Sequence, residues 1–154
     1  MNITTIRHAE LLATFDGPGP EQSGREISDA AVLIDGNRIA WVGPDGGLEA
    51  EVARRQVTPA REIDARHHVV IPGLVNTHHH FYQTLTRNLP AGQDAELFDW
   101  LVAHYPVWAR VDREALVASS KVAAAELMLS GCTTASDHTY LWPNDARVDD
   151  QIGA

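Results

Sequence analysis

The sequence is poor in cysteine, in long apolar runs and in positive charge, and each shortage excludes a class of protein. Cys132 is the single cysteine in 154 residues, so no internal disulfide can form, which fits a reducing, cytoplasmic setting. No run of about 18 apolar residues occurs, so we expect neither a transmembrane helix nor a membrane partner. The first eight residues lack a basic start followed by an apolar block, and we therefore expect no secretory signal.

The charge balance is acidic. Lys and Arg number 12 against 21 Asp and Glu, a formal net charge of −9. Binding to nucleic-acid phosphates needs a basic face, so we expect no nucleic-acid partner. The hydrophobic fraction of 44% is ordinary for a globular protein, and a chain of this length can bury a core.

Several catalytic signatures are missing from the sequence. The metalloprotease pattern His-Glu-x-x-His, the phosphate loop and Gly-x-Gly-x-x-Gly do not occur. His8-Ala9-Glu10 matches the His-x-Glu of the cytidine-deaminase fold, but that fold also needs Pro-Cys-x-x-Cys. The cysteine count excludes a zinc finger. Cys132 lies in an apolar strand pattern, which favours core packing over nucleophilic catalysis.

The first 68 residues are rich in short strand patterns. The clearest signal is a hairpin, in which the β-rich runs 31–34 and 38–43 are joined by Asp35-Gly36-Asn37. We therefore predict that residues 1–68 form a small β-domain, of the sandwich type. Its other expected elements are a strand over 11–15, a short helix over 48–55 and a strand over 61–64.

A different pattern begins at Val69. An apolar run continues through Pro72-Gly73 into a strand over 74–78, as expected for a strand covered on both faces. Helical spacing follows over 95–102 and over 113–129, with Asp112 as N-cap, and a strand is expected over 132–136. This order predicts one βαβ crossover of a parallel sheet, and therefore an α/β fold over residues 69–154.

Three consecutive histidines, His78, His79 and His80, end the strand expected over 74–78. Alternate side chains of a strand point to the same face, so His78 and His80 can reach one metal ion while His79 points away. A surface loop with incidental metal affinity is the alternative. The position at the end of an apolar strand favours a metal site, because that end carries the active site in parallel barrels.

The segment from Pro72 to His80 resembles the metal-binding signature of the amidohydrolase superfamily. Residues 34–43 and 63–65 resemble that family's N-terminal β-sandwich, and residues 130–134 resemble its second barrel strand. Within the superfamily, residues 78–87 and 136–144 are most similar to the aminohydrolase branch, above all to the 8-oxoguanine deaminases. Hydroxyatrazine-type aminohydrolases share much of the same pattern.

The resemblance implies a β-sandwich segment (1–68) followed by the first part of a metal-dependent (β/α)8 TIM barrel (69–154). It implies one Zn²⁺ per active site, with His78 and His80 as two of its ligands. A third histidine, an aspartate and the proton-transfer residues are expected beyond residue 154, so we expect the isolated 154-residue chain to be inactive. One departure is His67, where relatives often have glycine, which raises a question about the geometry of that turn.

Gln83 is the candidate substrate-binding residue, because guanine-type deaminases place a glutamine at this distance from the histidines and an amide both donates and accepts hydrogen bonds. An ordinary solvated helix residue is the alternative. Trp108 is expected either to line the pocket or to be a core residue. His138 is expected either to line the pocket or to be a hydrogen-bonded histidine at the end of a strand.

Three functional hypotheses follow from the sequence. The first is a zinc-dependent hydrolytic deaminase of a purine-type heterocycle, most similar to those acting on 8-oxoguanine. The second is a triazine or pyrimidine aminohydrolase of the same superfamily, and the third is a non-catalytic fragment. In the first two cases the partner is a small heterocyclic amine, and the resemblance also allows a homo-oligomer.

Overall fold

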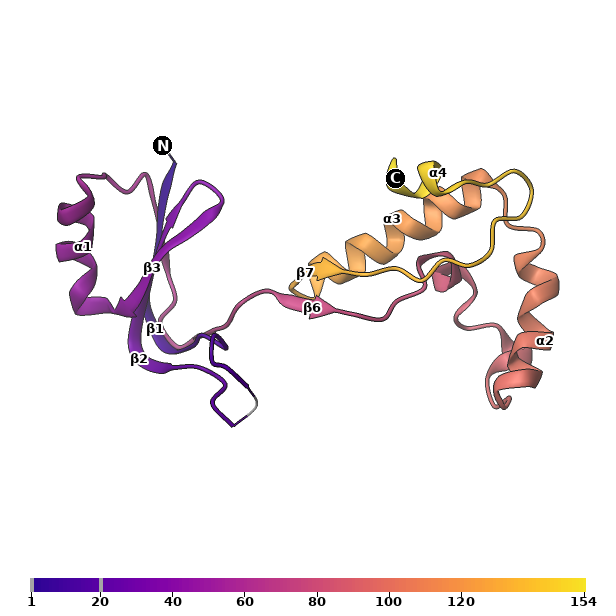
Figure 1. Ribbon diagram of the computed structural model, residues 1–154, viewed down its shortest axis with the longest axis horizontal. Coiled ribbons are helices and arrows are strands. Elements are labelled where there is room, and N and C mark those ends of the chain that lie inside the picture. Colours follow the sequence, from indigo (N-terminus) through magenta and orange to yellow (C-terminus); the bar gives the residue numbers. More distant parts are fainter. Residues whose placement is uncertain (1, 20) are drawn as a thin grey trace. The chain divides into compact units, whose positions relative to one another are not determined.

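The computed structural model describes residues 2–19 and 21–154, and the chain forms two compact units. Unit 1 spans Met1–Pro72 and unit 2 spans Gly73–Ala154, each with its own helices and strands, so the fold is mixed α/β (Figure 1). Among the described residues, no helix has the length and apolar character needed to cross a membrane.

Unit 1 is a sheet accompanied by one α-helix. The strand order is β3-β2-β1-β4, and β5 also pairs with β1. Neighbours β1, β2 and β3 are antiparallel, whereas β4 and β5 run parallel to β1. The described strands of this unit form this one sheet, and the sandwich stays a prediction. The elements are β1 (Ile3–Ala13), β2 (Glu26–Asp35), β3 (Arg38–Pro44), the 3₁₀ turn η1 (Asp45–Gly47), α1 (Leu48–Arg55), β4 (Arg61–Asp64) and β5 (Val69–Val70).

The hairpin expected from Asp35-Gly36-Asn37 is confirmed, because Asp35 pairs with Arg38 and Gly36 adopts a φ of 58°. The strand expected over 11–15 was wrong at both ends, since β1 runs from Ile3 to Ala13. A bulge between Ile6 and Ala9 explains why the first part of this strand was not predicted. A bulge inserts an unpaired residue and shifts the alternation of buried and exposed positions, so the period of two is broken within the strand.

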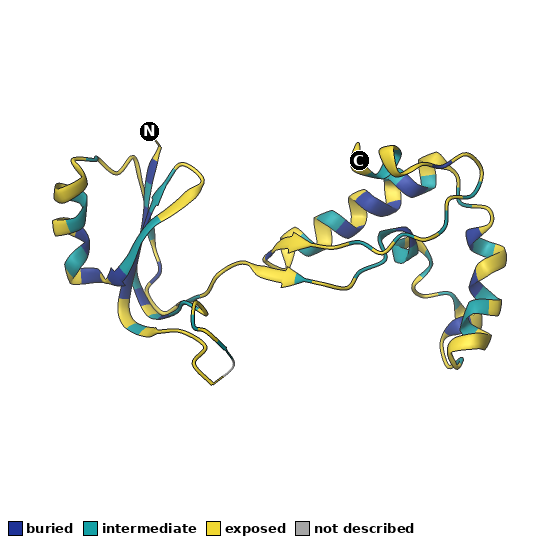
Figure 2. Ribbon diagram, in the orientation of Figure 1, coloured by how far each residue is buried: buried dark blue, intermediate teal, exposed yellow. Residues whose placement is uncertain are grey.

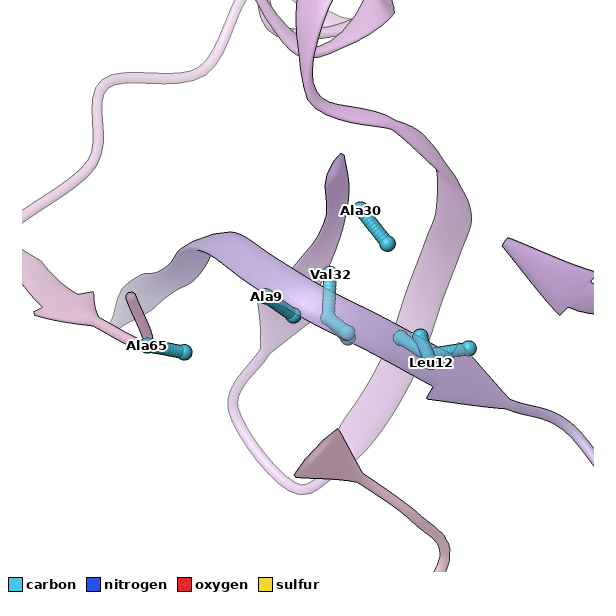
Figure 3. Close-up of a cluster of buried hydrophobic side chains, with 5 residues drawn as sticks. All are labelled: Ala9, Leu12, Ala30, Val32 and Ala65. Carbon is cyan, nitrogen blue, oxygen red and sulfur yellow. The ribbon is translucent and has the colours of Figure 1, made fainter. Parts of the chain in front are cut away.

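The sheet of unit 1 carries a hydrophobic cluster on each face. Figure 3 shows the first cluster, in which Ala9 and Leu12 of β1 lie beside residues of β2. The second cluster contains Leu48 of α1, which packs the helix against the opposite face. Because neighbouring residues of a strand point to opposite faces, β2 contributes alternate side chains to the two clusters. They are Ala9, Leu12, Ala30, Val32 and Ala65 in the first, and Ile3, Ala31, Leu33 and Leu48 in the second.

Unit 2 is built on a parallel pair of strands joined by a helical crossover, as the strand–helices–strand order predicted. Figure 2 shows buried positions along α3. Gly73 allows the two strands to approach, because a Cβ at this position would lie 2.2 Å from Cγ2 of Thr133. The elements are β6 (Leu74–Asn76), the 3₁₀ helices η2 (Phe81–Thr86) and η3 (Pro90–Gly92), α2 (Leu97–Trp108), α3 (Arg113–Leu129), β7 (Cys132–Ala135) and α4 (Val148–Ile152).

The helix predicted over 113–129 is confirmed as α3. Its N-cap Asp112 accepts a hydrogen bond from the backbone N–H of Ala115 at 2.9 Å, which satisfies one of the free donors of the first turn. The chain leaves this helix through Gly131, whose φ of 82° suits glycine. The helix expected over 95–102 begins at Leu97 and continues to Trp108, where it joins the core of unit 2.

Candidate metal centre

The three histidines lie just past the end of β6. We expected the strand to reach residue 78, but it ends at Asn76. The side-chain Oδ1 of Asn76 accepts a hydrogen bond from the backbone N–H of His78 at 3.0 Å, and such a local bond competes with strand pairing. The prediction that His78 and His80 point to the same face of a strand therefore assumed a strand longer than β6.

The imidazoles of His78 and His80 nevertheless converge. Their Nε2 atoms lie 3.1 Å apart, and the rings meet edge to face with centroids 4.9 Å apart. Two nitrogens at this separation, each about 2.05 Å from a common zinc ion, subtend roughly 100° at the metal, which is close to a tetrahedral angle. The pair therefore fits two positions of a zinc site.

A backbone carbonyl fixes the orientation of the His80 ring. Nδ1 of His80 lies 2.8 Å from the carbonyl oxygen of His138. A carbonyl oxygen only accepts, so Nδ1 carries the proton and donates it, and Nε2 keeps its lone pair for a metal ion. Metal-binding histidines usually have this kind of partner on the second ring nitrogen, which fixes the tautomer.

His79 has a different environment from its neighbours. Its ring packs edge-on against Phe81 with centroids 4.9 Å apart. Its Nδ1 is the one buried side-chain polar atom without a hydrogen-bond partner in the part of the chain that the structure describes. Burial is the main cause that lowers the pKa of His79. The contact with Phe81 and the burial of Nδ1 distinguish His79 from His78 and His80.

The described residues supply two candidate ligands and no complete set. The ring of His138 is close, with centroids 4.9 Å from His78 and 5.8 Å from His80. Even so, no group of three or more His, Cys, Asp or Glu side chains within residues 2–19 and 21–154 could hold a metal ion. His138 therefore contributes its carbonyl oxygen to the arrangement.

Gln83 lies in η2 beside the histidines and is held by two tyrosines. Its Nε2 donates to the hydroxyl of Tyr82 at 3.0 Å and to that of Tyr140 at 3.3 Å. Burial, and then hydrogen bonding to Tyr140, raises the pKa of Tyr82 well above its ordinary value. The amide of Gln83 is thus oriented by neighbours rather than free in solvent. An open pocket here is lined by His78, His79, His80, Gln83, Thr84 and Arg87.

Trp108 is a core residue and does not line this pocket. Its side chain is 1% exposed, and its Nε1 donates to Oγ1 of Thr86 at 2.9 Å. The sequence analysis missed two residues that contact the site, Tyr140 and Asp137. Both follow β7, and no spacing in the sequence links them to residues 78–83, so only the parallel pairing of β6 with β7 brings them there.

Comparison with known proteins shows the family of this chain. Residues 69–152 match the Amidohydrolase family, and the chain belongs to that family. It is 57% identical over 99% of its length to an 8-oxoguanine deaminase of Pseudomonas aeruginosa, and it spans 31% of that relative's length. It is also 36% identical over 77% of its length to the hydroxydechloroatrazine ethylaminohydrolase of a Pseudomonas species, of which it spans 25%.

Solved structures that are similar to this chain include zinc complexes. The atrazine chlorohydrolase of Arthrobacter aurescens in complex with zinc is similar over 97% of this chain and 32% of its own, with a TM-score of 0.80 and 28% identity. An adenosine deaminase of Xanthomonas campestris with bound zinc is similar over 97% of this chain and 30% of its own, with a TM-score of 0.76 and 27% identity.

Proposed function

We propose that the protein is a zinc-dependent hydrolase that removes an amino group from a purine-type heterocycle as ammonia, with 8-oxoguanine as the first candidate substrate. The observation that carries the proposal is the 57% identity over 99% of the chain to an 8-oxoguanine deaminase. Since the chain spans 31% of that relative's length, the remaining ligands and proton-transfer residues are proposed to lie outside residues 1–154.

In this proposal, residues of unit 2 hold and orient the reactants. His78 and His80 bind one zinc ion through Nε2, and the carbonyl of His138 holds the His80 ring. Bound zinc would supply a Lewis acid that lowers the pKa of a water molecule to about 7. Gln83, oriented by Tyr82 and Tyr140, presents its amide to the polar edge of the heterocycle.

We propose a fold for each part of the chain in the complete protein. Residues 1–68 are proposed as part of a β-sandwich and residues 69–154 as the first portion of a (β/α)8 barrel. The parallel pairing of β6 with β7 across a helical crossover supports the barrel, because successive barrel strands are joined in this way. A cytoplasmic location and one zinc ion per active site complete the proposal.

A triazine aminohydrolase is the second candidate. The 36% identity to the hydroxydechloroatrazine ethylaminohydrolase and the similarity to the zinc-bound atrazine chlorohydrolase favour it. Both relatives are named for triazine substrates, whose single ring differs from the fused rings of a purine. Substrate choice within one fold depends on the site, so the two candidates are separated by activity rather than by fold.

The amine released on hydrolysis decides between these candidates, because 8-oxoguanine and an aminopyrimidine release ammonia whereas an alkylaminotriazine releases an alkylamine. The protein expressed from the longest reading frame that contains residues 1–154 is incubated with 8-oxoguanine, a hydroxylated alkylaminotriazine and an aminopyrimidine, and its zinc content is measured alongside. We expect ammonia from 8-oxoguanine and about one zinc ion per chain. If the protein contains zinc and releases an amine from the triazine alone, the second candidate is the function. Absence of both zinc and activity would overturn the proposal.

A further inference from the structure

The carboxylate of Asp137 accepts hydrogen bonds from three separate parts of unit 2. Oδ1 accepts from the backbone N–H of Phe81, the residue after His80, at 2.7 Å. Oδ2 accepts from Oγ1 of Thr139 at 2.5 Å and from Nε2 of Gln151, in α4, at 2.8 Å. Asp137 thereby connects the segment after β6, the segment after β7 and α4.

The residue between Asp137 and Thr139 is His138, whose carbonyl holds the ring of His80. The backbone N–H of His138 also donates to the carbonyl of His79 at 2.8 Å. The hydrogen bond from Thr139 to Asp137 joins the two residues on either side of His138. The hydrogen bond from the backbone N–H of Phe81 to Asp137 holds the residue that follows His80. The position of the His138 carbonyl relative to His80 therefore depends on Asp137.

We propose that Asp137 is a positioning residue of the metal centre, which keeps the His138 carbonyl on Nδ1 of His80 and so keeps Nε2 of His80 free and aimed at the metal. The inference rests on the proposed zinc site at His78 and His80. Asp137 does not touch the metal or the substrate, and its effect on zinc passes through the orientation of His80. Partners of metal-binding histidines commonly change metal affinity by about 10–100-fold when they are removed.

Zinc affinity is the direct test. The protein from the longest reading frame that contains these residues is titrated with zinc against a chelator, as wild type, Asp137→Ala and Asp137→Asn. We expect Asp137→Ala to weaken zinc binding by about 10–100-fold. Asp137→Asn should restore most of the affinity, because the amide oxygen still accepts from Phe81. The matched control is Asp149→Ala, which removes the same charge from an exposed position of α4 and should bind zinc like the wild type.

The visible spectrum of the cobalt-substituted protein separates positioning from general stability. A reoriented His80 should change the cobalt absorption bands of Asp137→Ala, whereas a purely structural role would leave them as in the wild type. If Asp137→Ala does not fold, Thr139→Val removes one donor from the same carboxylate and should still lower zinc affinity. Tight zinc binding and an unchanged cobalt spectrum in folded Asp137→Ala would overturn the inference, and so would tight zinc binding in Thr139→Val if Asp137→Ala does not fold. A wild-type protein that binds no zinc would instead refute the proposed function.

Discussion

The guanidinium of Arg7 holds the carboxylate of Asp45 through two hydrogen bonds, from Nε to Oδ1 at 3.1 Å and from Nη2 to Oδ2 at 2.7 Å. Oδ1 also accepts from the backbone N–H of His8, at the bulge of β1, at 3.1 Å. The Asp45 side chain is 7% exposed, so the pair is shielded from solvent. Asp45 therefore ties η1 to the irregular part of β1.

The Arg7–Asp45 pair predicts a loss of stability in acid. The hydrogen bond from Arg7 is the main cause that lowers the pKa of Asp45. A lowered pKa stabilises the folded state above the unfolded value of about 3.9, and this contribution is lost as the pH falls through the folded pKa. We expect Asp45→Asn to reduce the free energy of unfolding by about 1.5–3 kcal/mol at pH 7, and by less at pH 3.

Urea unfolding followed by circular dichroism at the two pH values measures this difference. Asp94→Asn, at an exposed position of unit 2, is the control and should leave the unfolding midpoint unchanged. An equal loss of stability for Asp45→Asn at pH 7 and pH 3 would contradict the assigned role of the ionised pair.

His67 and His68 form a matched pair for a backbone prediction. His67 has a φ of 64° and a side chain that is 91% exposed, so the ring contributes little that offsets the cost of a left-handed conformation. We expect His67→Gly to raise the free energy of unfolding by about 0.5–1 kcal/mol. His68→Gly should lower it, since His68 is not left-handed and its Nδ1 is hydrogen-bonded to the carbonyl of Arg66. Thermal unfolding of both variants decides the sign, and a loss of stability in each would refute the strain argument.

The histidine triplet predicts an unequal response to alanine substitution. His78→Ala and His80→Ala should each lose zinc during gel filtration, because each removes one of two converging nitrogens. His79→Ala should retain zinc, since its ring packs against Phe81 and its Nδ1 is buried. Zinc content per chain, measured by atomic absorption, is the readout. Equal zinc loss in all three variants would show that the ligands are misassigned.

Gln83 predicts an effect on substrate binding that leaves the metal untouched. Loss of one hydrogen bond of about 1–1.5 kcal/mol corresponds to about a tenfold change in binding. We therefore expect Gln83→Ala to raise KM for the heterocyclic amine about tenfold, and Tyr140→Phe to raise it less, with zinc content unchanged. The control is Tyr105→Phe, which alters a tyrosine packed on Trp108 away from the pocket. An unchanged KM in Gln83→Ala would remove Gln83 from the substrate site.

The parts of the fold that local physics determines could be predicted from the sequence. The α3 helix begins after its N-cap Asp112 as expected, and the hairpin turns at Gly36. Both depend on neighbouring residues alone, such as a capping carboxylate or a residue that tolerates positive φ. The pairing of His78 with His80 also depends on residues close in sequence.

Features that depend on distant pairing could not be predicted in the same way. The bulge near His8 depends on the register of β1 against β2, which no periodicity in β1 reveals. The positions of Asp137 and Tyr140 depend on the pairing of β6 with β7. Asp137 gives no motif of its own, because its partners include a backbone N–H, and any residue except proline at position 81 supplies one.

The hydrogen bond between His80 and the His138 carbonyl joins residues 58 positions apart. During synthesis at about 5–20 residues per second, the ribosome needs roughly 3–12 s to add the residues between them. For that interval the nascent chain carries its histidine pair without the carbonyl that selects the tautomer of His80. The hydrogen bond that selects the tautomer of His80 therefore forms only after β7 and the segment that follows it have been made.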